Sequence, residues 1–187
     1  MKTLWLVRHA RPLIDTERCY GRLDIAADAE ATRQAAQDLR QSLQPLHGQL
    51  QIRHSPLQRC RQLALYLQTL EPDFVSIPDG RLLEMDFGHW EGLRWNDIGE
   101  AAIGAWAHDL ALHAPGDGES LAQMLQRVHE ALQDALSSNS EHMVWICHAG
   151  VARCAQWLLQ HGHRLPQSHE WTLSAPAYGQ WLRLELS

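Results

Sequence analysis

The chain has 187 residues and a mass of 21.3 kDa, a size that predicts a single domain over residues 1–187. Hydrophobic residues make up 45% and charged residues 20%, which excludes a disordered chain. The net charge of −6 argues against general nucleic-acid binding, because that function needs a basic surface. No apolar run approaches the ~18 residues of a membrane helix, and Leu4–Val7 is too short for the core of a signal peptide. We therefore expect a cytoplasmic protein that binds neither membranes nor nucleic acids.

Positive charge is concentrated in the first third of the chain. Residues 1–61 contain ten Lys or Arg and six Asp or Glu, whereas residues 62–187 contain six and sixteen. All cations except Lys2 are arginines, whose planar guanidinium can hold two oxygens of a phosphate or a carboxylate. Compositional bias explains most of these arginines, so their position must identify those that bind an anion.

The first half of the chain alternates predicted strands and helices. A short strand buried on both faces is predicted at Leu4–Val7. A helix with Asp28 as its N-cap is predicted over Asp28–Leu43. Gln51–His54 is a second predicted strand, and Ser55-Pro56 predicts a helix that begins with a serine N-cap and a proline in its first turn.

The second half continues this alternation. In chain order we predict a strand at Phe74–Ile77, a helix over residues 95–110, a helix over Ser120–Leu136, a strand at Met143–Cys147, a helix containing Val151–Leu158 and a strand at Tyr178–Leu186. Ser120 and Gln123 resemble a capping box. The last strand alternates apolar and polar residues like an edge strand, and Trp171–Ser174 is a candidate partner for it. Strands that alternate with helices indicate an α/β fold with a mostly parallel sheet.

Residues that can bind an anion follow three of the predicted strands. Arg8 and His9 end the first strand, Arg59 lies in the first turn of the helix after the second, and His148 follows the strand at Met143–Cys147. Ligands of such sheets bind beyond the carboxyl ends of the strands, where helix N-termini add unpaired N–H donors. Each residue alone is more often a surface or packing feature. If the three strands are neighbours, however, these side chains converge on a pocket for a compact anion such as phosphate.

Residues 83–92 form a predicted loop that contains three carboxylates, Glu84, Asp86 and Glu91. One interpretation is an ordinary exposed loop. The alternative is that one carboxylate reaches the anion pocket. Phosphate oxygens beside a carboxylate favour its protonated form, which suits a general acid.

Together these motifs resemble the histidine phosphatase superfamily, which is phosphoglycerate-mutase-like. They occur in the order typical of that family and lie within residues 4–150. The matching segments are Leu6–His9, Ser55–Arg59, Glu84 with Phe87–Gly92, and Cys147–Gly150. The segments Cys19–Asp24, Glu84–Glu91 and His113–Ser120 further resemble alpha-ribazole phosphatases. The resemblance implies a three-layer α/β/α sandwich with a mostly parallel central sheet.

The resemblance also implies a role for each matching residue. His9 would be the nucleophile that accepts the phosphoryl group, and Glu84 would protonate the leaving alkoxide and then activate water. The phosphate oxygens would be bound by Arg8, Arg59 and His148, and the mouth of the site would include Tyr20 and Gly21. We expect no metal and no other cofactor, because arginines and histidines neutralise the phosphate.

Three segments depart from the usual pattern of the family. Ala10–Pro12 stands where members commonly have Gly-Glu-Thr, and Asp15 stands near a common asparagine. Both changes lie at the expected mouth of the pocket, so they leave the substrate open. Cys60–Ala64 replaces Ala-x-x-Thr-Ala, a change that we attribute to packing.

We therefore predict a phosphomonoesterase that acts through a phosphohistidine on a small phosphorylated metabolite, with alpha-ribazole 5′-phosphate as the leading candidate. Sugar phosphates, nucleotides and phosphoproteins are other candidate substrates. A phosphoglycerate-type mutase and a non-catalytic member that binds phospho-ligands are alternative functions, although the short chain favours hydrolysis by analogy. The C-terminal edge strand is a candidate contact for a homodimer. The roles of Arg11, Arg22 and residues 86–95 in specificity stay open.

Other residue clusters have simpler explanations. His161 and His163, with His169 nearby, form a histidine-rich segment, but the His-x-His pair lies in a Gly/Pro-rich loop without nearby cysteine or carboxylate partners. We therefore expect these histidines to be exposed and to bind no metal. Trp90 and Trp95 are expected to be buried, with a place at the substrate mouth as the alternative. The four cysteines show no CxxC spacing and are expected to be buried thiols rather than a disulfide framework.

Overall fold

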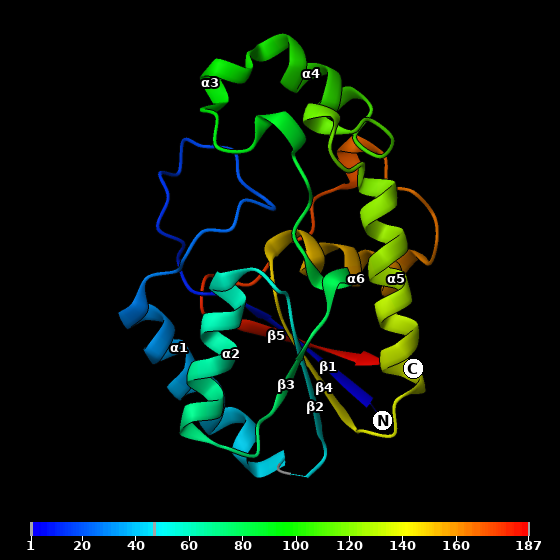
Figure 1. Cartoon of the computed structure of the whole chain (residues 1–187). Helices are drawn as coiled ribbons and strands as arrows, with labels where there is room; N and C mark the ends of the chain where they lie inside the picture. The colour runs from blue at the N-terminus through cyan, green and yellow to red at the C-terminus, as the bar shows by residue number, and fades with distance from the viewer. Residues whose placement is uncertain (1, 47, 187) are drawn as a thin grey trace.

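A five-stranded sheet forms the centre of the computed structural model, which describes residues 2–46 and 48–186 (Figure 1). Its strands lie in the order β3-β2-β4-β1-β5. The first four strands in this order run parallel, and β5 runs antiparallel to β1. Their bounds are Lys2–Arg8 for β1, Leu50–His54 for β2, Ser76–Pro78 for β3, His142–Cys147 for β4 and Trp181–Leu186 for β5. The predicted mostly parallel sheet is confirmed.

Helices cover both faces of this sheet. Figure 1 shows α1 and α2 on one side and α5 and α6 on the other. Side chains of β1 alternate between these layers, because Leu4 and Leu6 join the core beneath α5 and α6, whereas Trp5 and Val7 join the core beneath α1 and α2. The bounds of the four helices are Ala29–Leu43, Gln58–Leu70, Leu121–Ser137 and Ala149–His161, in chain order. The expected three-layer α/β/α arrangement is confirmed.

The chain between β3 and α5 forms a cap beyond one end of the sheet, where Figure 1 shows α3 and α4. Residues 95–110 form two helices instead of the predicted one, α3 at Trp95–Ile98 and α4 at Glu100–His108. The break is at Gly99, whose φ of 87° is not helical. Short 3₁₀ helices lie at Gln44–Leu46, Gly80–Leu82, Gly88–Trp90, Pro115–Asp117 and Ser168–Glu170.

Two of the three predicted helix starts are confirmed. The side chain of Asp28 accepts the N–H of Ala31 at 2.8 Å and caps α1. Ser120 and Gln123 form the predicted capping box of α5, with reciprocal hydrogen bonds of 3.3 and 2.8 Å.

The predicted start of α2 at Ser55 is wrong. The helix begins at Gln58, and the N–H of Gln58 donates to Oδ1 of Asp24 at 2.7 Å. The hydroxyl of Ser55 accepts only a long hydrogen bond from the N–H of Leu57, at 3.5 Å, and lies 2.8 Å from Nε2 of His148. The cap of α2 therefore comes from a distant segment, and the serine serves the interior of the molecule.

Two details of the predicted strands are also corrected. The strand expected at Phe74–Ile77 lies at Ser76–Pro78, because a turn places the Phe74 side chain in the core before the strand begins. The last strand pairs with β1 and not with Trp171–Ser174. That segment forms no strand, because side chains of α6 bind its backbone: Arg153 donates to the carbonyl of Leu173 and Gln156 to that of Ser174.

All four cysteines are buried and unpaired, as the sequence predicts. Trp90 is also buried, with 5% of its surface exposed, whereas Trp95, which was expected to be buried, is only half-buried. Over the described ranges, 2–46 and 48–186, no helix combines the length and the apolar composition that crossing a membrane requires.

Candidate active site

Three neighbouring strands end at one edge of the sheet and bring the predicted site residues together. The order β2-β4-β1 places these strand ends side by side, as the strand-end hypothesis requires. Arg8 ends β1 and His9 follows it, whereas His148 follows β4 and begins α6 as its N-cap. The ring centres of His9 and His148 are 5.1 Å apart. Two histidines that are distant in sequence therefore share one site.

His9 is buried and its tautomer is defined by its neighbours. Nδ1 lies 2.7 Å from the carbonyl oxygen of Ala10, and because a carbonyl only accepts, Nδ1 carries the proton. Nε2 therefore keeps a lone pair, which accepts the Nε–H of Arg59 at 3.3 Å. Burial and the guanidinium of Arg59 lower the pKa of His9 from 6.5 to about 3. At neutral pH the ring is uncharged, which is the form of imidazole that acts as a nucleophile.

Arg59 is fully buried in the first turn of α2, and three acceptors hold its guanidinium. Besides His9, these are the carbonyl of Leu23 at 2.9 Å from Nη1 and the carbonyl of Gly21 at 2.5 Å from Nη2. A Cβ on Gly21 would lie 1.9 Å from the carbonyl oxygen of Met85, so only glycine allows this close approach. Gly21 thus orients Arg59 through its backbone and does not line the cavity described below.

Two tyrosines form a rim above the arginines. The guanidinium of Arg8 lies 3.9 Å from the ring centre of Tyr178, and that of Arg59 lies 5.6 Å from the ring centre of Tyr20. The two tyrosine hydroxyls are 2.9 Å apart. The family resemblance implied a place for Tyr20 at the site, but Tyr178 was missed. The missing information is tertiary, because the N–H of Gly179 donates to the backbone at the end of β1 and so places the tyrosine there.

His148 lies behind His9 and is 1% exposed. Its Nε2 is 2.8 Å from the hydroxyl of Ser55 and 3.5 Å from the sulfur of Cys60. Burial and the guanidinium of Arg59 hold the pKa of His148 well below its usual value. The structure therefore places His148 as a neutral ring against His9, and it is not among the residues that line the cavity.

Glu84 is the carboxylate of the acidic loop that reaches this site. Its Oε2 accepts the N–H of Gly150 in the first turn of α6 at 3.1 Å, and its Oε1 accepts the N–H of Met85 at 3.1 Å. The positive end of a helix dipole stabilises a carboxylate in this position. A Cβ on Gly150 would lie 2.2 Å from Oε1, so the carboxylate occupies the space that a side chain would need.

The other two carboxylates of that loop, Glu91 and Asp86, bind neighbouring loop residues and do not line the cavity described below. Glu91 accepts the backbone N–H groups of Gly21, Arg22, Leu23 and Phe87 at 2.8 to 3.0 Å, and so holds the loop that supplies acceptors to Arg59. Asp86 lies 3.7 Å from the guanidinium of Arg22, which also lies 3.7 Å from Glu119. These contacts of Arg22, Asp86 and Glu91 therefore join the loop at residues 21–23 to the acidic loop.

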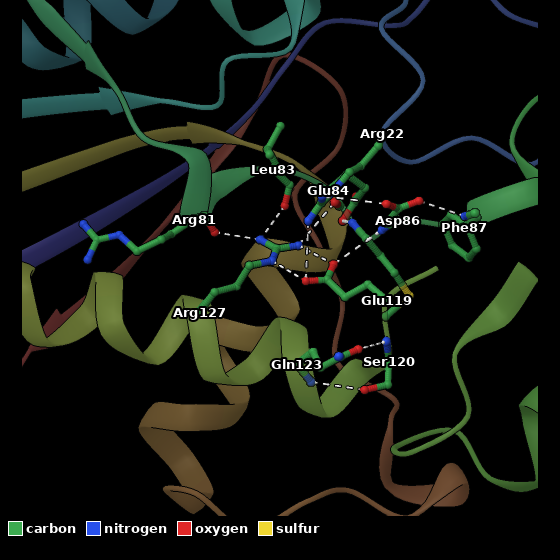
Figure 2. A network of polar contacts seen from close by, with 12 residues as sticks. Arg22, Arg81, Leu83, Glu84, Asp86, Phe87, Glu119, Ser120, Gln123 and Arg127 are labelled. Carbon is green, nitrogen blue, oxygen red and sulfur yellow. Dashed lines mark hydrogen bonds and ion pairs between the residues drawn. The ribbon is translucent and has the colours of Figure 1, made fainter. Parts of the chain in front are cut away.

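A polar network lies next to Glu84, between α5 and the segment that carries the carboxylate (Figure 2). The guanidinium of Arg127 in α5 forms a two-pronged ion pair with Glu119 at 2.6 and 2.8 Å. It also donates to three backbone carbonyls, those of Arg81 and Leu83 at 2.7 Å and that of Glu84 at 3.2 Å. Sequence reasoning missed Arg127 and Glu119, because neither follows a strand.

These residues surround a cavity of about 310 Å³. Its polar lining comes from Arg8, His9, Tyr20, Arg59, Glu84 and Arg153. Its apolar wall includes Phe87, Trp106, Leu110 and Trp171. Trp90 and Trp95 are not in the lining, and the ring of Trp90 packs 6.1 Å from that of Trp106. The tryptophans at the cavity are thus two that sequence reasoning did not select, since nothing in their local sequence shows where the chain folds back.

A second cavity of about 340 Å³ lies on the outer side of the tyrosine rim. Tyr20 borders both cavities, while Tyr178 and Arg11 border the second. Arg11, whose role the sequence left open, therefore lies outside the cavity that contains His9.

The histidine-rich segment contributes no side chain to the lining of the cavity that contains His9. His161, His163 and His169 are exposed, as expected, and the ring centres of His163 and His129 lie 4.0 Å apart, with the rings inclined to each other. Within the part of the chain that the structure covers, no group of three or more His, Cys, Asp or Glu side chains could hold a metal ion.

In a comparison with protein-family models, the model of the histidine phosphatase superfamily (branch 1) matches residues 4–187 of this chain. The chain belongs to this superfamily. The resemblance predicted from the motifs is therefore confirmed. In this superfamily member, Arg8, His9, Arg59 and Glu84 line one cavity, and His148 lies directly behind it.

Relatives of this superfamily member are phosphatases with several different names. "Putative phosphoserine phosphatase 2" of Hydrogenobacter thermophilus is 29% identical over 163 residues, which cover 85% of this chain and 79% of that protein. The "Metal-independent phosphoserine phosphatase" of Arabidopsis thaliana is 30% identical over 106 residues, which cover 53% and 44%.

Solved structures that share the fold include two phosphatases. A mycobacterial glucosyl-3-phosphoglycerate phosphatase has a TM-score of 0.82 and 23% identity, with 97% of this chain and 89% of that chain covered. The alpha-ribazole phosphatase from Shigella flexneri has a TM-score of 0.82 and 23% identity, with 99% and 91% covered. Because the names of these relatives specify different substrates, the substrate must be argued from the site itself.

Proposed function

We propose that this superfamily member is a phosphomonoesterase that hydrolyses a small phosphorylated metabolite through a phosphohistidine at His9. The observation that carries the proposal is the state of His9, a neutral ring whose Nε2 lone pair meets Arg59 in a cavity that also contains Arg8 and Glu84. Phosphoryl transfer requires a positioned nucleophile and neutralised oxygens more than it requires covalent chemistry from the protein.

In the first step, Nε2 of His9 attacks phosphorus while the bond to the ester oxygen breaks. The guanidinium groups of Arg8 and Arg59 hold the phosphate oxygens, and the phosphate takes over the Arg59 donor that Nε2 accepts in the free site. Glu84 gives its proton to the departing alkoxide, and the phosphate brought beside it favours the protonated carboxyl.

In the second step, the carboxylate of Glu84 takes a proton from water, and the oxygen of that water attacks the phosphohistidine. The N–P bond breaks, inorganic phosphate leaves, and Glu84 is protonated again for the next ester. His9 recovers its neutral form, because Nδ1 keeps the hydrogen bond to the carbonyl of Ala10 throughout. His148 supports the ring of His9 from behind.

The remainder of the cavity favours an ester whose alcohol part carries an apolar ring. Trp106, Leu110 and Trp171 offer flat apolar surface, and Arg153 adds one cation at the lining. Alpha-ribazole 5′-phosphate, which the motifs at Cys19–Asp24 favour, fits this description as a specific candidate. A phosphoglycerate-type mutase and a non-catalytic binder of phospho-ligands are the alternative functions.

The proposal is tested by release of inorganic phosphate and by trapping of the phosphoenzyme. The substrates are alpha-ribazole 5′-phosphate, phosphoserine, a sugar phosphate, a nucleotide and a phosphopeptide, and interconversion of 2- and 3-phosphoglycerate is measured in parallel. We expect phosphate release, with alpha-ribazole 5′-phosphate preferred, and little interconversion. Rapid interconversion would support the mutase, and tight phosphate binding without turnover of any ester would support the binder.

Trapping tests the nucleophile separately. A radiolabelled substrate is mixed with the wild type and with His9→Ala, and the reaction is stopped with alkali, in which phosphohistidine survives. We expect protein-bound label in the wild type and none in the variant. Label on folded His9→Ala protein would refute the assignment of His9.

A further inference from the structure

The guanidinium of Arg127 is fully engaged with the part of the chain that carries Glu84. Its five N–H donors go to two oxygens of Glu119 and to the carbonyls of Arg81, Leu83 and Glu84. Figure 2 shows the guanidinium between Glu119 and this backbone. One side chain of α5 thus reaches three carbonyls within residues 81–84, at the start of the acidic loop.

The segment that Arg127 binds has little regular structure of its own. Residues 83–87 belong to neither a helix nor a strand, so no ladder of backbone hydrogen bonds sets their position. Arg127 supplies hydrogen bonds to the carbonyls of Leu83 and Glu84. Glu119 binds the backbone of Asp86 from the other side, because its N–H donates to the Asp86 carbonyl at 2.8 Å and its Oε2 accepts the Asp86 N–H at 3.4 Å.

The ion pair makes this arrangement stable in a buried place. The side chains of Arg127 and Glu119 are 14% and 10% exposed. An unpaired cation at this depth would be strongly unfavourable, whereas two parallel hydrogen bonds to a carboxylate neutralise it and fix its plane. A lysine in place of Arg127 would keep the charge but could not reach five acceptors.

We propose that Arg127, paired with Glu119, is the positioning residue for Glu84: it holds the backbone of residues 81–84 so that the Glu84 carboxylate stays against the N-terminus of α6. The role rests on the proposed function, in which Glu84 is the general acid. Arg127 touches neither substrate nor reacting atoms, since it is not in the lining of the cavity. Its hydrogen bonds reach the site through the segment that carries Glu84.

A positioning role makes a kinetic prediction that a purely structural role does not. A general acid accelerates loss of a poor leaving group by about 10² to 10⁴-fold, but a nitrophenolate leaves without a proton. The test compares kcat/KM for ethyl phosphate and dinitrophenyl phosphate, because kcat/KM reports on transfer to His9 and not on later hydrolysis. We expect Arg127→Met and Arg127→Lys to lose at least ~10-fold on ethyl phosphate and less than ~3-fold on dinitrophenyl phosphate.

The matched control is Arg40→Met. Arg40 lies in α1, pairs with Glu71 at 3.4 Å and is remote from the cavity, so both esters should keep wild-type kinetics. Combining Arg127→Lys with Glu84→Gln should cost no more on ethyl phosphate than Glu84→Gln alone, because the acid to be positioned is already absent. Equal losses of Arg127→Lys on both esters, or full additivity in the double variant, would overturn the proposal.

A measurement without turnover separates this proposal from the proposed function. The amide of Gly150 donates to Glu84, so its hydrogen exchange, measured by NMR, reports whether the carboxylate is in place. We expect exchange at least ~10-fold faster in Arg127→Lys than in the wild type or in Arg40→Met. Unchanged exchange of this amide would overturn the positioning role even if the protein hydrolysed no ester. If Arg127→Met does not fold, Arg127→Lys and Glu119→Gln are used for the same test. Exchange of the Gly150 amide at the wild-type rate in both variants would also overturn the positioning role.

Discussion

Replacing Gly150 by alanine should separate the stability of the fold from the position of Glu84. Gly150 lies in the first turn of α6, where alanine adopts the same backbone conformation and is favoured over glycine by up to ~1 kcal/mol. The helix itself therefore tolerates the change. The steric conflict is with Glu84, because the new methyl group would overlap its carboxylate.

The size of the displacement follows from the geometry. The added Cβ would lie 2.2 Å from Oε1 of Glu84, whereas real Cβ contacts do not fall below 3.0 Å, so the carboxylate must move by at least about 0.8 Å. Met124 approaches the same Cβ at 3.0 Å and limits the directions of escape. A misplacement of this size at a reacting group costs roughly 10²-fold in rate, or about 2.7 kcal/mol in the transition state.

The assay pairs urea unfolding with kinetics on ethyl and dinitrophenyl phosphate. We expect Gly150→Ala to unfold at the same or a higher urea concentration and to lose about 100-fold in kcat/KM on ethyl phosphate. The control is Gly104→Ala in α4, where a Cβ meets nothing within 4 Å, so stability should rise and activity should not change. Wild-type hydrolysis of ethyl phosphate by Gly150→Ala would show that the carboxylate seen against α6 is not the group that acts.

Three further predictions concern the centre of the site. Glu84→Gln should slow hydrolysis most for esters with poor leaving groups, by at least ~100-fold, and equal slowing of nitrophenyl and alkyl phosphates would count against a general acid. Arg59→Lys should lower kcat/KM by at least ~100-fold and lower the free energy of unfolding by about 2–3 kcal/mol, because the carbonyls of Leu23 and Gly21 lose their donors; full activity with lysine would exclude two-oxygen binding by this residue. Stability should also depend on pH: the pKa of His9 is about 3 in the folded state and 6.5 in the unfolded chain, so the unfolded state binds the extra proton below pH 6.5. Titration of His9 should then lower the free energy of unfolding by about 2 kcal/mol when the pH falls from 7 to 5. The free energy of unfolding of His9→Gln should depend correspondingly less on pH. The same pH dependence in the variant and the wild type would mean that His9 is not buried as a neutral ring.

The parts of the site that lie on regular elements were predictable from sequence. An apolar strand followed by Arg8 and His9 indicates where the sheet ends, and three such ends in parallel strands meet at one edge. Asp28 and Ser120 cap the helices that they were expected to cap. In each case the signal is local, because the residues that determine the structure lie within about four positions of one another.

The parts that depend on distant segments were not predictable in this way. Ser55 has the local pattern of an N-cap, yet the cap of α2 comes from Asp24, and the serine binds His148. Trp106 and Trp171 reach the cavity only because the chain between β3 and α5 and the segment after α6 fold back over the sheet edge. The helix pattern over residues 95–110 also carried no sign that Gly99 would adopt a positive φ.

This contrast separates the nucleophile from the acid. His9 directly follows a central strand that is paired on both sides, so its backbone can move only if the sheet moves. Glu84 lies in an irregular segment whose place depends on contacts with Arg127, Glu119 and Gly150. Substitutions far from the cavity should therefore disturb proton transfer before they disturb attack on phosphorus. The dependence of the rate on the leaving group is for this reason the most sensitive measure of how well the whole site is assembled.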